Sequence, residues 1–540
     1  MTATKEHPPA SAQAPASRRG LGAPAFSGVI AMAAFLAVAE LVSLVVGPNG
    51  SPLFAVGSLA IDAAPKGVKD LMVSTFGTGD KIALFALMGV ILVLVTAAAG
   101  IVEDRRPPVG KIVFGLGGVI ALVAVLTRAD ATSLDGVPTA VATVVALLVL
   151  TVLLKRLRRW RATEQAGWAA STDFVPSLRG PAIERRAFLG YAVVLGVASV
   201  VVGTGARVKN AASTAVTAAR QAVRLPAAAV TEQAVPAGAS LSIDGITPYV
   251  TPNDDFYRID TALQVPSVDP ATWSLSITGL VDREVTISYD ELLALPLEEH
   301  MATLSCVSNE VGGDLIGNAL WLGYPIRRLL AQAGVQGGAD MVLSTSVDGF
   351  TAGTPLSVLQ DDSVDALLAV GMNGEPLPTE HGFPVRMVVP GLFGYVSATK
   401  WVTSLEVTRF DRAEGYWTPR GWDALGPVKL ESRIDTPTTR STFAPGDTVP
   451  IAGVAWEPHT GVAKVEVKVG DDEWAAAELA EAVSDDTWVQ WVYRWTAVSG
   501  SHDVFVRATS KDGSVQASAY VPPAPNGAEG WDQISLTVSA

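Results

Sequence analysis

The chain has 540 residues, of which 49% are hydrophobic and only 17% are charged. Soluble domains carry about 25% charged residues, so part of this chain is expected to lie where charge is expensive. The formal net charge of −14 argues against a protein that neutralises nucleic-acid phosphates. The single cysteine, Cys306, excludes an intramolecular disulfide and a zinc site of four cysteines.

The charge is divided between two parts of the chain. Residues 1–206 hold 18 Lys/Arg and 12 Asp/Glu, whereas residues 207–540 hold 21 and 41. The basic part contains five apolar runs, and each is long enough, or nearly so, to cross about 30 Å of hydrocarbon as a helix. We therefore predict a cytoplasmic tail and a five-helix transmembrane region; buried helices of a soluble core are the alternative. The tail covers 1–25 and the region covers 26–206, with runs at 26–46, 82–102, 109–126, 137–154 and 187–206.

Basic residues between the runs predict the orientation of the chain in the membrane. If the N-terminus is inside, the inner segments 1–25, 103–111 and 155–186 carry 3, 3 and 8 Lys/Arg. The outer segments 47–81 and 127–136 then carry only four. Since inner loops are enriched in Lys and Arg, the chain is predicted to be a multi-pass cell-membrane protein with its acidic part on the extracytoplasmic side.

Two adjacent arginines, Arg185 and Arg186, stand before the fifth run and are followed by Ala-Phe-Leu. This pattern is similar to a twin-arginine export signal, which serves proteins that fold around a cofactor before export. Simple anchors at the inner face are the alternative. No histidine lies within the five runs, so no haem is predicted there and the helices are expected to act as an anchor.

The acidic part of the chain divides into a tether and two domains. Residues 207–242 are rich in alanine and are expected to be a partly helical tether. Short β-branched segments and short helical patterns then predict an α+β domain over 243–425. Alternating runs with regularly spaced turn residues predict an all-β immunoglobulin-like sandwich over 426–540, with the acidic stretch 478–486 as a solvated hairpin edge.

Two stretches of the α+β domain could carry chemistry. Cys306 lies among small polar residues with Gly312 and Gly313 close behind, which favours a loop in which a thiolate holds a soft metal. An inert buried thiol is the alternative. Further on, His381, Arg386 and Lys400 form a positive patch that suits a phosphate or another anion. Alternatively, Arg386 pairs with a carboxylate and His381 is an ordinary loop residue.

These stretches resemble the sulfite oxidase family of molybdenum enzymes over about 245–540. The resemblance rests on the cysteine loop, on the segment from Gly317 to Trp321, and on Met-Asn-Gly-x-Pro-Leu-Pro…His-Gly-Phe-Pro-Val-Arg…Val-Pro-Gly…Lys-Trp. It implies a molybdenum–molybdopterin cofactor in the α+β domain. It also implies a dimerisation role for the sandwich, and hence a homodimer.

The resemblance also implies roles for individual residues. Cys306 would be the protein thiolate on molybdenum, and Arg258 would face an oxyanion substrate. The residues that would contact the pterin cofactor, or close over its phosphate end, are Asp348, His381, Arg386, Ser397, Ala398, Thr399 and Lys400. No cytochrome b5 domain is recognised, so a separate electron-transfer partner is expected.

Two departures from the family pattern concern the substrate. Ile259 and Asp260 follow Arg258, where members that oxidise sulfite have Asn-His. Trp422 stands where those members have a tyrosine near the metal. An acid and a tryptophan change the charge and hydrogen bonding at the substrate, so the direction of the reaction stays open.

The leading hypothesis is a membrane-anchored molybdenum oxidoreductase that transfers an oxygen atom on a small oxyanion such as sulfite. Reduction of a sulfoxide or N-oxide on the same cofactor is the first alternative. The second is of another class, a non-catalytic receptor or binding module displayed on a membrane anchor.

Overall fold

The computed structural model describes residues 20–46, 50–65, 67–68, 72, 75–76, 80–128, 131–169, 179–211, 214–439 and 441–539. The chain forms two compact units, Met1–Ala212 and Ser213–Ala540.

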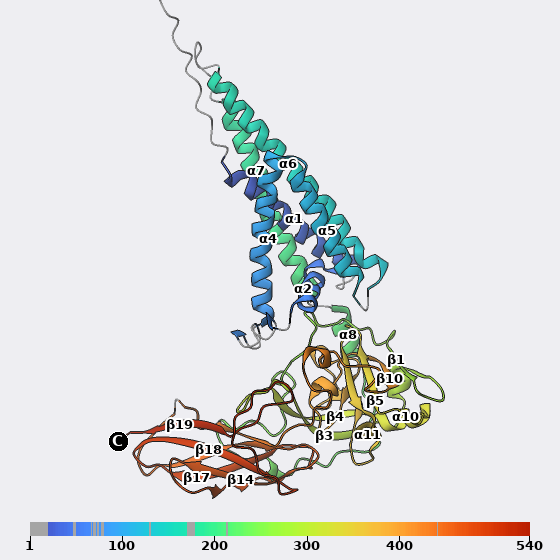
Figure 1. The fold of residues 1–540 in the computed structure, drawn as a ribbon, viewed down its shortest axis with the longest axis vertical. Coiled ribbons are helices and arrows are strands. Elements are labelled where there is room, and N and C mark those ends of the chain that lie inside the picture. The colour runs from blue at the N-terminus through green and yellow to red at the C-terminus, as the bar shows by residue number, and fades with distance from the viewer. Residues whose placement is uncertain are drawn as a thin grey trace, which may run out of the picture. The chain divides into compact units, whose positions relative to one another are not determined.

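The first unit is built from helices only, in its described part. Five of them are long and apolar enough to cross a membrane, by length and composition, which agrees with the five predicted runs. The short apolar helix α2 was not predicted. The helices are α1 (Gly22–Val46), α2 (Pro52–Ala63), α4 (Asp80–Arg105), α5 (Val109–Leu126), α6 (Gly136–Ala169) and α7 (Arg179–Ala211) (Figure 1).

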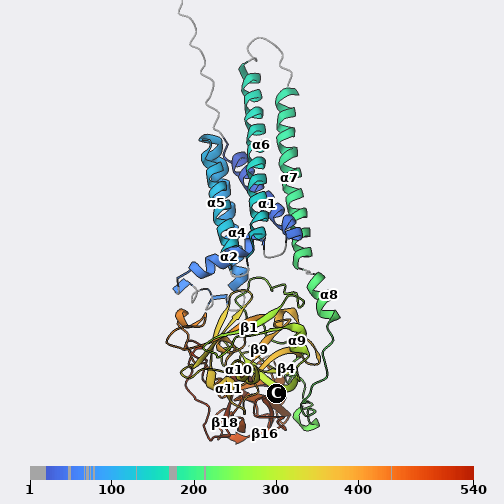
Figure 2. The same ribbon diagram turned by 90° about the vertical axis from the view of Figure 1, so that its right-hand side faces the viewer.

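Small residues let these helices approach one another closely. A Cβ atom on Gly28 of α1 would overlap the carbonyl oxygen of Thr96 in α4, so only glycine allows this contact. The helices α6 and α7 run side by side (Figure 2). The bundle also buries Glu103, whose carboxylate lies 3.7 Å from Lys111 Nζ at the turn between α4 and α5.

The first part of the second unit contains one mixed sheet and one antiparallel sheet. The first has the order β2-β1-β10-β5-β6 and the second has the order β3-β4-β7-β8, with β9 paired to β7. The strands are β1 (Ser274–Gly279), β2 (Val285–Ser288), β3 (Glu298–Ser305), β4 (Ile316–Pro325), β5 (Met341–Ser346), β6 (Thr351–Pro355), β7 (Leu367–Met372), β8 (Glu375–Pro376), β9 (Arg386–Val388) and β10 (Val402–Thr408).

Short helices connect these strands and follow local sequence signals. The helix α9 (Tyr289–Leu293) begins at a capping box, in which Ser288 and Glu291 satisfy each other's backbone N–H groups. The helix α10 (Ile326–Ala333) buries its apolar face and ends at Gly334, whose φ of +72° suits glycine. The others are α8 (Thr214–Ala222) and α11 (Leu356–Gln360).

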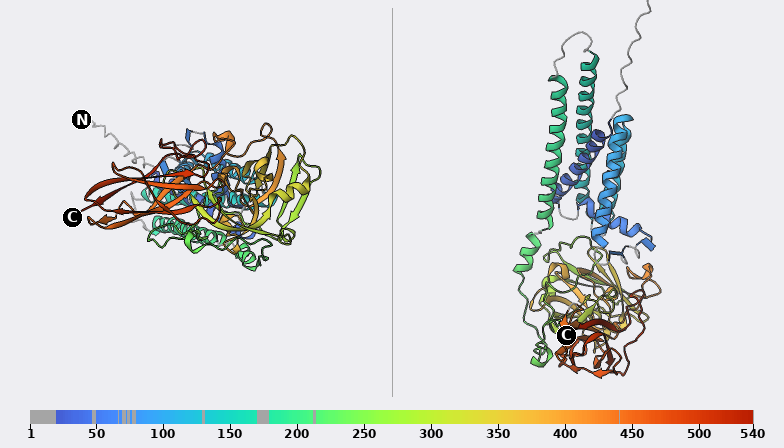
Figure 3. Two further views of the ribbon diagram at one scale, coloured as in Figure 1. Left: turned by 90° about the horizontal axis from the view of Figure 1, so that it is seen from below. Right: turned by 90° about the vertical axis from the view of Figure 1, so that its left-hand side faces the viewer.

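The C-terminal strands form the predicted immunoglobulin-like sandwich, at one end of the second unit (Figure 3, left). One sheet has the order β11-β13-β17-β16 and the other β12-β19-β18-β14-β15. The strands are β11 (Glu431–Thr436), β12 (Thr442–Phe443), β13 (Thr448–Trp456), β14 (Val462–Val469), β15 (Ala475–Ala476), β16 (Glu478–Leu479), β17 (Val489–Thr496), β18 (Gly500–Ser510) and β19 (Asp532–Val538). Their inward side chains form one apolar core, because alternate residues of a strand face the same side.

Two segments differ from the sequence expectation. The acidic stretch begins as the edge strand β16, but its far end is not solvated: the Asp486 carbonyl accepts the N–H of Thr303 at 2.9 Å. Docking of the sandwich on β3 explains this difference. The expected tether is packed from α8 onward, where Arg220 donates to the carbonyls of Pro376 and Leu377 at 2.7 and 2.8 Å.

Candidate functional site

Cys306 follows β3 directly and opens the loop to β4. Its own N–H donates to the Leu315 carbonyl at 2.9 Å, which closes the loop, and its Sγ accepts the N–H of Ser308 at 3.4 Å. The side chain of Asn309 braces the same loop by accepting the N–H of Leu315 at 2.9 Å. Burial raises the pKa of the Cys306 thiol. The thiol is therefore held in a fixed loop rather than in a strand, as the sequence predicts.

The sandwich holds the far side of the cysteine loop. Arg433 on β11 donates from Nη1 to the Gly313 carbonyl at 2.7 Å and from Nη2 to Thr247 Oγ1 at 2.9 Å. Its Nε binds Asp435 at 2.7 Å, and both side chains are buried. The position of Cys306 thus depends on the C-terminal domain as well as on its own strand.

The segment leading to Arg258 is fixed by two asparagines. Asn373 has a φ of +51°, and its amide group donates to the Thr251 carbonyl at 2.9 Å and to Asn253 Oδ1 at 2.8 Å. Its Oδ1 accepts the N–H of Leu320 at 2.9 Å. Farther along, Phe256 packs where a Cβ on Gly317 would lie 2.6 Å from its ring, so the glycine makes room for the ring.

His381 and Arg386 lie together and are buried. His381 ends a short turn, Thr379–His381, and its Nε2 lies 3.1 Å from the Asn253 carbonyl. Burial lowers the pKa of His381 to about 4, and the charges of Arg386 and Lys400 act in the same direction. The imidazole is therefore neutral at pH 7.

Arg386 on β9 is a buried cation. It donates to the carbonyls of His381 and Met387 at 3.2 and 3.3 Å, and it lies 5.1 Å above the ring of Trp321. Among the residues that the structure describes, no carboxylate pairs with it. Burial lowers the pKa of Arg386 to about 10. A buried cation without a counter-ion is costly, and an anionic ligand would remove that cost.

Lys400 and Arg258 share one carboxylate. The Oδ2 atom of Asp260 lies 2.9 Å from Lys400 Nζ and 2.9 Å from Arg258 Nε. Lys400 also donates to the Glu380 carbonyl at 3.0 Å. Burial lowers the pKa of Lys400 to about 8 although Asp260 opposes that change. The arginine predicted to face the substrate and the lysine predicted to bind the cofactor are therefore neighbours.

The loop before Lys400 presents its hydroxyl groups to the protein interior. Ser397 donates to the Phe393 carbonyl at 3.0 Å, and Thr399 Oγ1 lies 2.7 Å from the hydroxyl of Ser344. Ala398 is half-buried between them, and its N–H donates to Gly394. Since both hydroxyls have partners within the chain, any contact of this loop with an anion is expected through the backbone and Lys400.

Asp348 lies in the turn between β5 and β6, beside the same cluster. Its carboxylate accepts the hydroxyl of Thr261 at 3.4 Å, and the neighbouring Val347 N–H donates to the Trp401 carbonyl at 3.0 Å. Trp422 lies in an aromatic group instead, 5.9 Å from the ring of Tyr395 and 6.3 Å from that of Trp417. Arg386 contacts the carbonyl of His381 and Lys400 contacts that of the neighbouring Glu380, whereas Trp422 contacts other aromatic rings.

Three residues of the site were missed by sequence reasoning. Tyr257 is half-buried, its ring stacks on that of Phe256 with the centroids 5.2 Å apart, and desolvation raises its pKa. Asn253 and Asn373 hold the segment that carries it. The Asn-Gly pair at 373–374 signals a turn, but nothing local shows that its side chain reaches a segment more than a hundred residues away.

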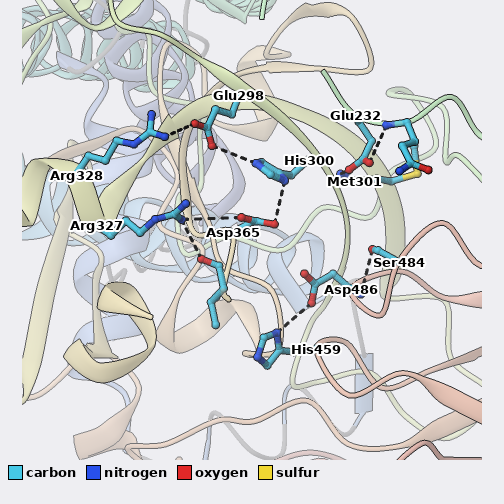
Figure 4. A network of polar contacts seen from close by, with 12 residues as sticks. Glu232, Glu298, His300, Met301, Arg327, Arg328, Asp365, His459, Ser484 and Asp486 are labelled. Atoms are coloured by element: carbon cyan, nitrogen blue, oxygen red, sulfur yellow. Dashed lines mark hydrogen bonds and ion pairs between the residues drawn. The ribbon is translucent and has the colours of Figure 1, made fainter. Parts of the chain in front are cut away.

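A second polar network lies outside this site (Figure 4). His300 on β3 contacts Glu298 at 3.4 Å and Asp365 at 3.0 Å, and Arg328 pairs with Glu298. Towards the sandwich, His459 Nδ1 lies 3.5 Å from Asp486. The Thr303 N–H of β3 donates to the Asp486 carbonyl at 2.9 Å, which joins the two parts of the network. Across the described residues, no group of three or more His, Cys, Asp or Glu side chains could hold a metal ion.

Known proteins are similar to this part of the chain. Residues 262–417 match the family described as oxidoreductase molybdopterin binding domain, and residues 431–506 match the bacterial Ig domain. The uncharacterized oxidoreductase YuiH of Bacillus subtilis is 33% identical over 158 residues, which are 29% of this chain and 76% of that protein. The mitochondrial sulfite oxidase of Rattus norvegicus is 31% identical over 274 residues, covering 43% of this chain.

This chain belongs to the sulfite oxidase family of molybdopterin oxidoreductases. It spans about half the length of the rat sulfite oxidase, 49%. A crystal structure of the sulfane dehydrogenase SoxCD from Paracoccus pantotrophus aligns with 53% of this chain and 81% of that chain, at 21% identity and a TM-score of 0.47.

The residues present fit the molybdenum cofactor that membership of the sulfite oxidase family implies. Cys306 offers one soft sulfur donor, and soft donors suit such metals. One protein ligand cannot hold a bare ion, which agrees with a metal that arrives with an organic ligand. The buried Arg386, with no carboxylate partner among the described residues, supplies the positive charge that the anionic end of such a ligand needs.

Proposed function

We propose that this protein is a membrane-anchored molybdenum oxidoreductase that catalyses oxygen-atom transfer on a small oxyanion such as sulfite. The observation that carries the proposal is the juxtaposition of a buried loop thiol with buried cations. Cys306 follows β3 directly, and Arg386 lies 5.1 Å over the ring of Trp321, whose Nε1 donates to the Ala302 carbonyl of β3 at 3.3 Å. The receptor hypothesis loses its support, because the chain belongs to a family of oxidoreductases.

The chain's own residues would hold the cofactor and shape its surroundings. Cys306 would ligate the metal, while Arg386 and Lys400 would bind the anionic groups of the pterin and its phosphate. His381, neutral at pH 7, would donate or accept a hydrogen bond without adding charge. When bound, the cofactor supplies two-electron oxygen-atom transfer.

Arg258 would bind the substrate at the entrance to this region. Its side chain is 42% exposed, and its Nε is held 2.9 Å from Asp260 Oδ2. Sulfite oxidation would release two electrons, and a separate carrier would remove them. Reduction of a sulfoxide or N-oxide remains the second candidate, because Asp260 and Trp422 stand where sulfite-oxidising members carry other residues.

Loss of Cys306 tests the cofactor assignment. The purified Cys306→Ala variant should keep the thermal unfolding midpoint of the parent but lose turnover, because the metal loses its protein ligand. Metal analysis should find about one molybdenum per chain in the parent after expression in a cofactor-competent host. Undiminished turnover in a metal-loaded Cys306→Ala sample contradicts the proposal.

A substrate panel separates the two directions of reaction. Sulfite with ferricyanide as electron acceptor tests oxidation, and dimethyl sulfoxide or trimethylamine N-oxide with reduced viologen tests reduction. Activity in the first assay alone supports sulfite oxidation, whereas activity in the second alone supports the reductase.

The membrane topology is part of the same proposal. Five long apolar helices and the distribution of basic residues support a multi-pass anchor with the catalytic domain outside the cytoplasm. A reporter protein that works only outside the cytoplasm should show activity when it is fused after residue 540. If Arg185 and Arg186 act as a twin-arginine signal, replacing both with lysine should stop export while leaving membrane insertion of the earlier helices.

A further inference from the structure

One carboxylate controls two of the cations in the candidate site. Asp260 Oδ2 lies 2.9 Å from Arg258 Nε and 2.9 Å from Lys400 Nζ, and only 4% of the Asp260 side chain is exposed. Two cations this close to a buried carboxylate favour its charged form and hold it between them. It therefore adds one negative charge to the region where the substrate is proposed to bind.

The contact with Asp260 leaves part of Arg258 available. Within the described residues, the bond of Arg258 to protein runs through Nε, so both Nη groups can bind a ligand. Lys400 differs, because its ammonium is nearly buried, with 10% of the side chain exposed, and it also donates to the Glu380 carbonyl. An incoming anion can thus bind the Nη groups of Arg258 while Asp260 holds the Nε atom.

The charges of Arg258, Lys400 and Asp260 decide which anions the site binds best. Arg258 and Lys400 carry two positive charges, and Asp260 cancels one of them. The energy of an ion in a given potential is proportional to its charge, so this cancellation weakens the binding of a dianion twice as much as that of a monoanion. A neutral substrate with a polar oxygen is affected least.

We propose that Asp260 is a specificity-determining residue that disfavours dianions at this site relative to monoanions and neutral S-oxides or N-oxides. This inference rests on the proposed function. Asp260 acts through Arg258 and Lys400 and is not itself proposed to touch the substrate.

Anion binding without turnover tests this role. Sulfate serves as the dianion, nitrate as the monoanion and dimethyl sulfoxide as the neutral probe, and each is titrated calorimetrically into the detergent-purified holoenzyme. Asp260→Asn should bind sulfate about tenfold more tightly than the parent. It should bind nitrate about threefold more tightly, because half the free-energy gain corresponds to the square root of ten. Dimethyl sulfoxide affinity should change less than twofold.

Two further variants make the comparison specific to charge and place. Asp260→Glu keeps the charge and should keep the parent's ratio of sulfate to nitrate affinity. Asp411→Asn removes an exposed carboxylate that pairs with Arg409 on the surface, and it should leave all three affinities unchanged. If Asp260→Asn fails to fold, the affinities of the parent protein test the proposal. A parent that binds sulfate more than tenfold more tightly than nitrate overturns it.

The outcomes separate this inference from the proposed function. Molybdenum in the parent together with an unchanged sulfate affinity in Asp260→Asn overturns the role of Asp260 alone. An equal change in affinity for all three probes in Asp260→Asn also overturns it, because a change of shape rather than charge would affect each probe alike. Absence of molybdenum and pterin from the parent overturns the proposed function, whatever the anion titrations show.

Discussion

Single side chains that contact distant segments fix the part of the candidate site where the substrate is proposed to bind. Asn373 is the clearest example, because it combines a left-handed backbone with three hydrogen bonds to other segments. Its bonds connect β4 and the turn after β7 to the segment that carries Arg258. Asn373 therefore adopts the backbone conformation that the turn requires and also holds the segment that carries Arg258.

The substitution Asn373→Gly separates these two roles, since glycine keeps the backbone conformation and removes the side-chain bonds. We expect a loss of about 2–3 kcal/mol in the free energy of unfolding, at about 1 kcal/mol for each lost bond. Asn373→Ala should lose more, because a Cβ disfavours a φ of +51°. Denaturant unfolding followed by tryptophan fluorescence measures both, and an Asn373→Ala variant more stable than Asn373→Gly contradicts the interpretation.

Gly317 makes room for Phe256, and an added methyl group tests this packing. The new Cβ would lie 2.6 Å from the Phe256 ring, which already packs against Trp321 at 5.7 Å and His381 at 5.5 Å. Gly317→Ala should therefore cost about 1–3 kcal/mol and lower the molybdenum content. The matched control is Gly337→Ala, where the added Cβ meets nothing within 4 Å and stability should stay within about 0.5 kcal/mol. Equal stability of the two variants would refute this reading.

At the scale of elements, titratable groups that lie on and near β3 face others that belong to the sandwich (Figure 4). Burial raises the pKa of Asp486 to about 6, although His459 opposes this and Asp365 adds to it. For His300, burial lowers the pKa, but the hydrogen bonds and charges of Asp365 and Glu298 outweigh burial and raise it. Both groups hold a proton more firmly in the folded protein than in the unfolded chain.

The pH dependence of stability follows from these directions. The folded state binds the Asp486 proton up to about pH 6, whereas the unfolded state releases it near pH 4, so stability falls as pH rises through this window. The contribution of His300 is present below about pH 6.5 and is lost as pH rises through its raised pKa. Thermal unfolding should therefore give a lower midpoint at pH 8 than at pH 5. Asp486→Asn should flatten the slope between pH 4 and 6, while the exposed Asp472→Asn should leave it unchanged.

At the scale of the second unit, the sandwich is part of the construction of the site. Arg433 joins β11 to the cysteine loop through Gly313 and to the segment at Thr247, and it is paired with Asp435 in a buried position. Removing one partner of such a pair leaves a buried charge without compensation. The C-terminal domain therefore contributes to the placement of Cys306.

The substitution Arg433→Ala tests this coupling. It should cost about 3–5 kcal/mol of unfolding free energy and reduce the molybdenum content, because the cysteine loop loses its brace. Arg494→Ala is the matched control: its pair with Glu478 is exposed, with 58% and 66% of the side chains accessible, so the loss should stay below about 1 kcal/mol. Full molybdenum content in Arg433→Ala would show that the loop does not depend on the sandwich.

Features whose signal is local could be predicted from the sequence. Apolar runs of about 20 residues, the periodic face of α10 and the alternating strands β13 and β14 each depend on neighbouring residues only. The motifs around Cys306 and His381 could also be recognised, and they pointed to the correct family.

Only the tertiary structure decided which distant groups meet. The pairing of Asp260 with Lys400 joins residues 140 positions apart, and the buried state of Arg386 depends on rings from another strand. The acidic stretch ending at Asp486 looked like a solvated edge, because composition does not reveal which surface a second domain will cover. The family, the kind of cofactor and the apolar helices could therefore be inferred from the order of residues alone. The charge balance at the entrance to the site was decided by the fold, since electrostatic energy depends on distance and burial rather than on order along the chain.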